Sequence, residues 1–258
     1  MTEMRCVLDA QAKLAECPRW DEQTQTLYFV DIDSFELHAY NTQSGDHSVR
    51  RFEEEIGCFS LTNNGGFIAA FRSGVYTFAD FNAPLVSYWQ ADYDQKTTRF
   101  NDGRCDPSGR FWVGTIDATE AAPSASLYRL DGDRLTSVKG ALAISNGLAF
   151  SPDGRFIYHS DSPTRQVWRY AFDAERGTLE AGELWVDLAR HDLPGVPDGA
   201  AVMLLPRQFV FCVTYFEACG IAVQRHARVP RLRPPLRALR HDGRGSRGGS
   251  IISARADF

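Results

Sequence analysis

Short apolar and aromatic runs alternate with polar turns along the chain, and one such unit recurs. The segments "LTNNGGFIAAF", "CDPSGRFWVGT" and "FSPDGRFIYHS" each place an apolar run before a polar turn and an aromatic strand after it. Their turn glycines, Gly66, Gly109 and Gly154, lie 43 and 45 residues apart. An earlier copy, "CPRWDEQTQTLYFVDID" at 17–33, has a turn without glycine. A repeat of this length is typical of propellers and other repeat architectures.

Each copy continues with a second pair of alternating segments rich in Val, Tyr, Phe and Trp: "FELHAYN", "GVYTFAD", "SLYRLDGDRL" and "QVWRYAFDAERGTLE". Alternation bounded by Gly, Asp and Asn predicts strands joined by hairpins, and no segment shows a better helical spacing. Four strands per repeat make one propeller blade, whereas a β-sandwich does not explain the regular intervals. We therefore predict an all-β protein, a β-propeller, with its aromatic residues packed between the blades.

Equivalent positions in successive blades should converge on one ring around the central channel. Counting eight residues back from each turn gives Glu16, Cys58, Asn101 and Asn146, and Asp198 holds a comparable place in "VPDGAAV". Four of these five side chains offer oxygen, and carboxylates with amide carbonyls suit Ca²⁺, Mg²⁺ or Mn²⁺ better than a soft metal. The alternative is that "NDG", "SNG" and "PDG" are ordinary turns, since Asn, Asp and Gly are the usual turn residues.

Length, charge and cysteine content exclude several classes of protein. The 258 residues fit one large domain, and a net charge of −5 gives no reason to expect nucleic-acid binding. No apolar run is long enough for a membrane span, and the N-terminus lacks the apolar core of a secretory signal. The six cysteines form no CxxC pair, so we expect a reduced, cytoplasmic protein.

Several other residues favour structural roles. His159 alternates within a strand and is expected to be a buried, hydrogen-bonded histidine, and Asp102 is expected to be a turn residue. The six histidines share no repeated position. The segment "GRGSRGG" at 243–249 lacks the strand–turn–helix context of a phosphate loop and is interpreted as flexible.

The repeated motifs resemble those of a known family. "LAECPRW", "RFNDGRCDPSGRFWVGT", "SNGLAFSPDGRFIYHSD" and "PDGAAV" are similar, in this order, to motifs of the senescence marker protein/regucalcin/gluconolactonase family. The resemblance implies a six-bladed propeller with one divalent metal ion at the channel mouth, Ca²⁺ first, with Zn, Mn, Mg or Fe as alternatives. It implies Glu16, Asn146 and Asp198 as metal ligands and Arg99 and Asn101 as substrate contacts. Cys17 replaces the commoner glycine, which should disturb Glu16 little.

The family resemblance implies a sugar lactonase, a gluconolactonase-like carboxylic ester hydrolase that opens an aldonolactone to the aldonic acid. The metal would polarise the lactone carbonyl, and Asp198 would be the catalytic base that activates water. Arg99 would hold sugar hydroxyls, although a surface salt bridge is its alternative role. The partner is a small-molecule sugar lactone, with no nucleic acid and no membrane.

Two other functions remain open at this point. One is a non-catalytic, calcium-binding regulatory propeller of the regucalcin type, which would use the same ligands. The other is a different hydrolase, such as a phosphotriesterase-like or paraoxonase-like esterase, on the same scaffold.

The pattern changes after Val202. Residues 203–258 carry ten Arg, no Lys and three acidic residues, while acidic residues dominate residues 1–202. We interpret 1–202 as propeller blades and 203–258 as an aberrant basic tail, partly disordered, and prefer a lost reading frame to a genuine anion-binding tail. The last blades would then be incomplete. An unclosed ring exposes strand edges, which would impair this chain.

Overall fold

A computed structural model describes residues 5–119, 123–190, 195–203, 208–216, 222–229 and 252–253. The described residues form β-strands joined by turns, and their one helical element is a single 3-10 turn, Ser162–Thr164. In this part of the chain, no helix is long and apolar enough to cross a membrane.

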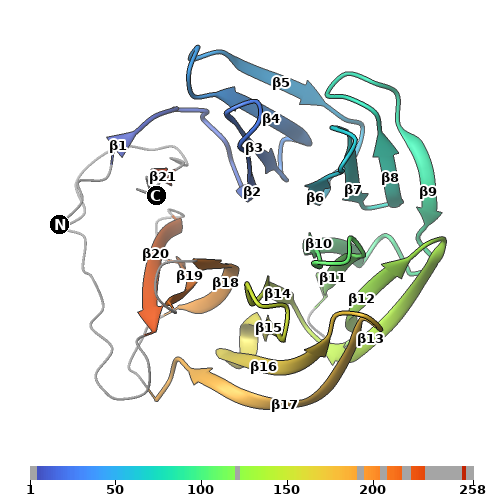
Figure 1. Ribbon diagram of the computed structural model, residues 1–258, viewed down its shortest axis with the longest axis vertical. Coiled ribbons are helices and arrows are strands. Elements are labelled where there is room, and N and C mark those ends of the chain that lie inside the picture. Colours follow the sequence, from blue (N-terminus) through green and yellow to red (C-terminus); the bar gives the residue numbers. More distant parts are fainter. Residues whose placement is uncertain are drawn as a thin grey trace.

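Four sheets of four antiparallel strands follow one another along the chain and stand around a common axis (Figure 1). The first two are β2 (Ala15–Asp21), β3 (Thr26–Asp31), β4 (Glu36–Asn41), β5 (His47–Arg51) and then β6 (Ile56–Leu61), β7 (Phe67–Phe71), β8 (Gly74–Phe78), β9 (Val86–Gln90). The next two are β10 (Thr98–Cys105), β11 (Phe111–Asp117), β12 (Ala125–Asp131), β13 (Arg134–Leu142) and β14 (Ser145–Phe150), β15 (Phe156–Asp161), β16 (Gln166–Asp173), β17 (Thr178–Asp187). The predicted all-β propeller blades are confirmed.

A fifth sheet contains three strands, β18 (Val196–Met203), β19 (Gln208–Phe216) and β20 (Ala222–Val229). A two-stranded pair joins β1 (Arg5–Cys6) to β21 (Ile252–Ser253), at the two ends of the chain. Among the described residues this sheet has three strands, and the predicted incompleteness of the last blades falls largely outside the described residues and stays a prediction. Strand β20 reaches Val229, but most of the predicted tail lies outside the described residues, and its interpretation as an out-of-frame segment stays a prediction.

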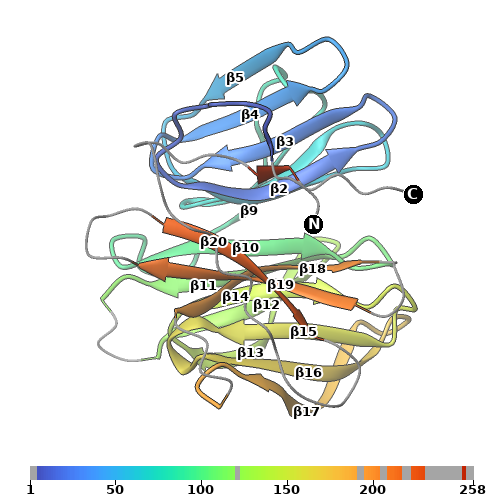
Figure 2. The same ribbon diagram turned by 90° about the vertical axis from the view of Figure 1, so that its left-hand side faces the viewer.

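The first strand of every sheet lines the axis (Figures 1 and 2). Neighbouring first strands contact one another around the ring, β2 with β6, β6 with β10, β10 with β14 and β14 with β18. Since the five sheets repeat one strand order, these inner strands all begin at the same end of the axis. We call that end the first mouth of the channel and the opposite end the second mouth.

A register shift interrupts each inner strand at a similar level. Two residues face one partner residue between Glu16 and Arg19 of β2 and between Asn146 and Ala149 of β14, and comparable shifts occur in β6, β10 and β18. A β-bulge of this kind bends the strand and turns side chains to a new direction. The bulges therefore explain how polar residues of buried inner strands come to face the axis.

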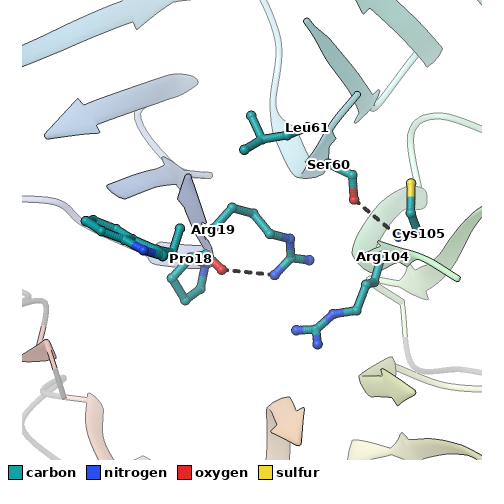
Figure 3. A pocket seen from close by; sticks show the side chains of 7 residues that line it. Pro18, Arg19, Ser60, Leu61, Arg104 and Cys105 are labelled. Carbon is teal, nitrogen blue, oxygen red and sulfur yellow. Dashed lines mark hydrogen bonds between the residues drawn. The ribbon is translucent and has the colours of Figure 1, made fainter. Parts of the chain in front are cut away.

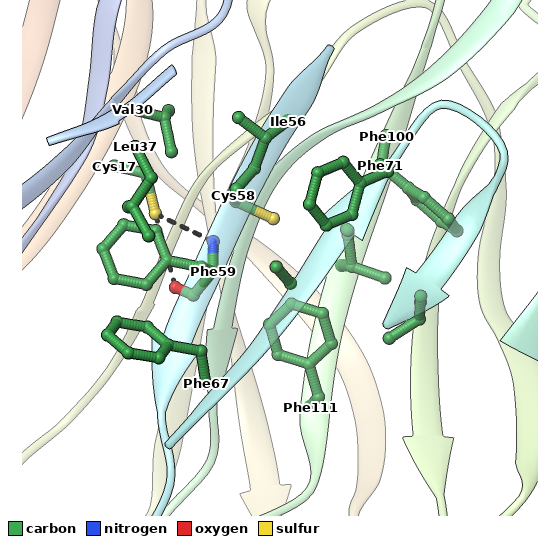
Figure 4. Packing of buried hydrophobic residues seen from close by; sticks show 14 of the residues in the cluster. Cys17, Val30, Leu37, Ile56, Cys58, Phe59, Phe67, Phe71, Phe100 and Phe111 are labelled. Carbon is green, nitrogen blue, oxygen red and sulfur yellow. Dashed lines mark hydrogen bonds between the residues drawn. The ribbon is translucent and has the colours of Figure 1, made fainter. Parts of the chain in front are cut away.

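Aromatic and branched residues fill the space between the sheets. Phe59, Phe71 and Phe100 are almost fully buried in one cluster that joins the first three sheets (Figure 4). A second cluster around Trp112 and Phe172 joins the third and fourth sheets. The predicted packing of aromatic residues between blades is confirmed, and it leaves the inner strands' polar residues for the channel.

Candidate active site

Asn146 and Asp198 meet at the first mouth. Asn146 is the second residue of β14 and Asp198 the third of β18, and the Asn146 Nδ2 donates to Asp198 Oδ1 at 2.8 Å. Asn146 also donates to Ser162 Oγ at 3.2 Å, and its Oδ1 accepts the Gly147 amide at 3.1 Å. The Asn146 amide is therefore held in one orientation by neighbours from its own sheet and the next.

Glu16 lies beside this pair on the second residue of β2. Desolvation raises the pKa of the Glu16 carboxyl well above its usual range, and the negative charges of Asp198 and Asp102 raise it further. The Arg99 guanidinium acts in the opposite direction. Three carboxyl groups from three inner strands are thus gathered at one place, where they repel one another unless a positive charge joins them.

Arg99 and Asn101 form a linked pair on β10. The Arg99 Nη1 donates to Asn101 Oδ1 at 3.0 Å and to the Phe100 carbonyl at 3.0 Å. Asn101 Nδ2 donates to the Ser145 carbonyl of β14 at 3.1 Å. The Asn101 side chain therefore fixes Arg99 against the next sheet, and it carries a second amide hydrogen that this bond does not use.

Cys17 occupies the bulge of β2 at the position that Gly147 holds in β14. Both residues have positive φ, 53° for Cys17 and 62° for Gly147. Glycine takes this conformation without cost, whereas a residue with a Cβ is strained there. The Cys17 thiol is buried and lies 3.4 Å from both the amide and the carbonyl of Phe59. Cys17 therefore has a strained backbone, and its thiol packs against β6.

Asp102 differs from the expectation. It belongs to strand β10, not to a turn, and its Oδ2 accepts the Leu148 amide of β14 at 2.8 Å. The bulge between Phe100 and Gly103 carries it to the channel, close enough to Glu16 for their charges to interact. The "NDG" triplet has the composition of a turn, so sequence reasoning missed a bulge residue that faces the site.

Burial decides the roles of two further residues, Cys58 and His159. Cys58, placed on the ring by counting, is fully buried in the hydrophobic cluster, so it does not offer a ligand to the channel. His159 is fully enclosed, lies 2.8 Å from Ser145 Oγ through its Nε2, and burial lowers its pKa to about 3. The predicted structural role of His159 is confirmed.

A second group of potential ligands lies away from the axis, in the first sheet. One ligand atom from each of Asp31, Glu36 and His38 lies within 4.8 Å of the others, and all three residues are buried. Glu36 Oε2 lies 3.1 Å from His38 Nε2, and Arg51 Nε donates to Glu36 Oε1 at 2.6 Å. His38 Nδ1 is 2.9 Å from His47 Nε2. These side chains are close enough to hold a metal ion, but each is already paired.

Asp31 has a structural explanation. Its carboxylate accepts the amides of Lys13 and Leu14 at 2.9 and 3.0 Å, just before the inner strand of the same sheet. Asp161 accepts the amides of Ala143 and Ile144 in the corresponding place of the fourth sheet. The repetition indicates that an aspartate at the end of the second strand anchors the entry to the inner strand.

The first mouth fits a hard cation better than the Asp31 group does. Glu16, Asp198 and Asn146 offer oxygen atoms, and burial together with the charges of Asp198 and Asp102 raises the pKa of Glu16. A divalent cation prefers such a set of carboxylate and amide oxygens. Asn146 Oδ1 accepts one hydrogen bond, from the Gly147 amide, and as a carbonyl oxygen it keeps a second lone pair for a cation.

The chain is similar to sugar-lactone enzymes over most of its length. It is 39% identical over 199 residues to the 6-deoxy-6-sulfogluconolactonase of Pseudomonas putida, covering 77% of this chain and 68% of that protein. It is 33% identical to a pentonolactonase of Haloferax volcanii, over 85% of this chain and 75% of that one. A solved structure, the calcium-binding protein regucalcin of Agrobacterium tumefaciens, matches 86% of this chain and 76% of its own length with a TM-score of 0.76 at 22% identity.

The family model described as SMP-30/gluconolactonase/LRE-like region matches residues 14–219. This range contains all five inner strands, so it includes Glu16, Arg99, Asn101, Asn146 and Asp198. It ends inside the segment that the sequence predicts to be an aberrant tail. On the extent of this match and on the identity to its relatives, the chain belongs to the SMP-30/gluconolactonase/LRE-like family.

Proposed function

We propose that the protein hydrolyses a sugar lactone to the corresponding aldonic acid, at the first mouth of the channel. The observation that carries the proposal is the contact between Asn146 Nδ2 and Asp198 Oδ1 beside the Glu16 carboxyl. Relatives named as lactonases at 33% and 39% identity support the reaction class. A lactone is an internal ester, so the reaction needs a carbonyl activator, a base and a binding surface for hydroxyl groups.

Glu16, Asn146 and Asp198 would hold a divalent cation, Ca²⁺ first by the hardness of the donors. Bound there, the cation would supply Lewis-acid polarisation of the lactone carbonyl. Glu16 contributes negative charge and Asn146 a neutral oxygen. The hydrogen bond from Asn146 to Asp198 also fixes where the Asp198 carboxylate lies.

Asp198 would act as the general base. Its carboxylate takes a proton from water as the water oxygen attacks the carbonyl carbon. When the bond from that carbon to the ring oxygen breaks, the proton passes to the ring oxygen, which becomes a hydroxyl group of the open aldonic acid.

Arg99 and Asn101 would bind the hydroxyl groups of the sugar. The fork of Arg99 donors is held by Asn101 and the Phe100 carbonyl, which lowers the entropy lost when substrate binds. Asn101 presents its second amide hydrogen at the same place. A polyol such as an aldonolactone matches this group of donors and acceptors.

The test is pH-stat hydrolysis of a panel of pentono- and hexonolactones, before and after treatment with a chelator. We expect turnover that falls with chelation and returns with added Ca²⁺ or another divalent cation. Asp198→Asn should lower kcat by about a hundredfold or more, the usual size of a general-base contribution. Turnover that is indifferent to chelation and to Asp198→Asn would contradict the proposal.

A calcium-binding protein without lactonase activity is the alternative, favoured by the similarity to the regucalcin structure. Both functions use the same cation ligands. The pH-stat assay distinguishes the two functions, since a calcium-binding protein would take up Ca²⁺ and leave every lactone of the panel intact.

A further inference from the structure

A pocket opens on the channel, lined by residues from β2, β6 and β10 that lie toward the second mouth. It has a volume of about 390 Å³, and its lining contains Pro18, Arg19, Trp20, Ser60, Leu61, Arg104 and Cys105 (Figure 3). Arg19 is the fifth residue of β2 and Arg104 the seventh of β10, whereas Glu16 and Arg99 are the second residues of these strands. The pocket is therefore distinct from the proposed lactone site.

Two guanidinium groups from different sheets share this pocket. Figure 3 shows the Arg19 and Arg104 side chains reaching into the same space from the two sides. Arg19 donates to the carbonyls of Pro18 at 3.0 Å and Gly103 at 2.6 Å, and Arg104 donates to the Ala200 carbonyl at 2.9 Å. The Nε atoms of both arginines are buried and have no hydrogen-bond partner among the described residues.

The charge of the pair is poorly balanced. Burial and the neighbouring Arg19 charge lower the pKa of Arg104 to about 10, which still leaves both groups positive at neutral pH. Asp102 is the carboxylate whose charge acts on both arginines. Burial raises the pKa of Asp102, and its Oδ2 already accepts the Leu148 amide. One constrained carboxylate therefore faces two guanidinium groups.

The remaining walls are suited to a small organic anion. Ser60 Oγ accepts the Cys105 amide at 3.2 Å, and a hydroxyl is also able to donate a hydrogen bond. Pro18 and Leu61 provide apolar surface, and the Trp20 side chain at the rim is 45% exposed. Arginine forks recognise phosphate and carboxylate oxygens through paired, charge-assisted hydrogen bonds.

We propose that Arg19 and Arg104 bind a small oxyanion, a phosphate or a carboxylate, in this pocket toward the second mouth. The proposal does not depend on lactone hydrolysis. A bound oxyanion would supply the negative charge that Asp102 alone does not provide, and it would bridge the first and third sheets across the channel.

The test is calorimetric titration of the whole protein with inorganic phosphate and, separately, with gluconate, at constant ionic strength. Arg19→Gln and Arg104→Gln remove one charge each and keep a donor for the carbonyl contacts. Arg155→Gln, an arginine in an exposed turn, is the matched control. We expect one or both anions to bind, at least about tenfold more weakly to either pocket variant and unchanged to the control. The anion that binds more tightly shows whether the pocket prefers a phosphate or a carboxylate.

If either variant fails to fold, a measurement on the unmodified protein still tests the proposal. Phenylglyoxal modifies accessible arginines, and mass spectrometry reports each site. We expect the bound anion to protect Arg19 and Arg104 while Arg155 reacts as before. The proposal is overturned if neither anion binds, if binding survives both pocket variants, or if Arg99→Gln abolishes it while the pocket variants do not.

Discussion

The side-chain amide of Asn146 donates to Asp198 Oδ1 at 2.8 Å, which joins the inner strands of the fourth and fifth sheets. The two residues are 52 positions apart in the sequence. Asn146 is the last regularly paired residue before the bulge of β14, and Asp198 lies within the bulge of β18. The proposed site is thus a property of the ring of sheets, not of a local motif.

Removing this amide should impair both cation binding and catalysis. Asn146→Ala leaves Asp198 Oδ1 without its donor and deletes one proposed cation ligand. We expect Ca²⁺ affinity to fall by about tenfold or more and kcat to fall with it, a loss of about 1.5–3 kcal/mol for a hydrogen bond to a charged group. Calorimetry and the pH-stat assay measure the two effects.

Asn82→Ala, in an exposed loop, is the control for that variant and should match the wild type. Full activity of Asn146→Ala would show that this contact does not serve the reaction.

Cys17 should tolerate glycine and reject a branched side chain. Its φ of 53° costs about 1–2 kcal/mol for a residue with a Cβ. Cys17→Gly removes this strain and loses the buried thiol, so we expect a change in unfolding free energy within about 1 kcal/mol. Cys17→Val adds branched bulk at the same φ and should lose about 1–3 kcal/mol. Urea denaturation measures both, and equal stability of the two variants would contradict the argument from backbone strain.

Sequence reasoning placed Glu16 and Asn146 at one repeated position and Asp198 at a comparable one, and the structure brings the three together, while their roles as metal ligands stay a prediction. It misjudged Asp102 and Cys58, because a bulge shifts the direction of side chains by one residue and bulges leave no clear pattern in one sequence. The "NDG" at 101–103 has the composition of a turn and the position of a strand. The Arg19–Arg104 pair was missed because arginine recurs at that position in only two inner strands, three positions beyond Glu16 and Asn101.

Acid should destabilise the fold through His159. Burial lowers its folded pKa to about 3, whereas an unfolded histidine titrates near 6.5. The unfolded chain therefore binds more protons between these values, so stability falls as pH falls from about 6.5 toward 3, by up to about 1.4 kcal/mol per pH unit. Urea midpoints from pH 7 to 4 should show this slope.

His159→Gln keeps a donor for Ser145 and cannot titrate, so its stability should depend less on pH over the same range. A slope identical to that of the wild type would exclude His159 as its source.

Cation affinity should rise with pH. In the cation-free protein, desolvation and the charges of Asp198 and Asp102 raise the pKa of Glu16, so a cation must displace a proton at low pH. Below that raised pKa, Ca²⁺ affinity should increase by up to about tenfold per pH unit, and above it the dependence should vanish. Titration in two buffers of different ionisation enthalpy would report the released proton. An affinity that is constant from pH 5 to 8 would contradict this origin.

The most direct measurement of the central claim is the number of divalent cations bound per chain, by elemental analysis after dialysis against Ca²⁺. We predict one cation for the wild type and for Glu36→Gln, and none for Glu16→Gln. Loss of the cation in Glu36→Gln with full occupancy in Glu16→Gln would place it at the Asp31, Glu36 and His38 group instead and contradict the account of the first mouth.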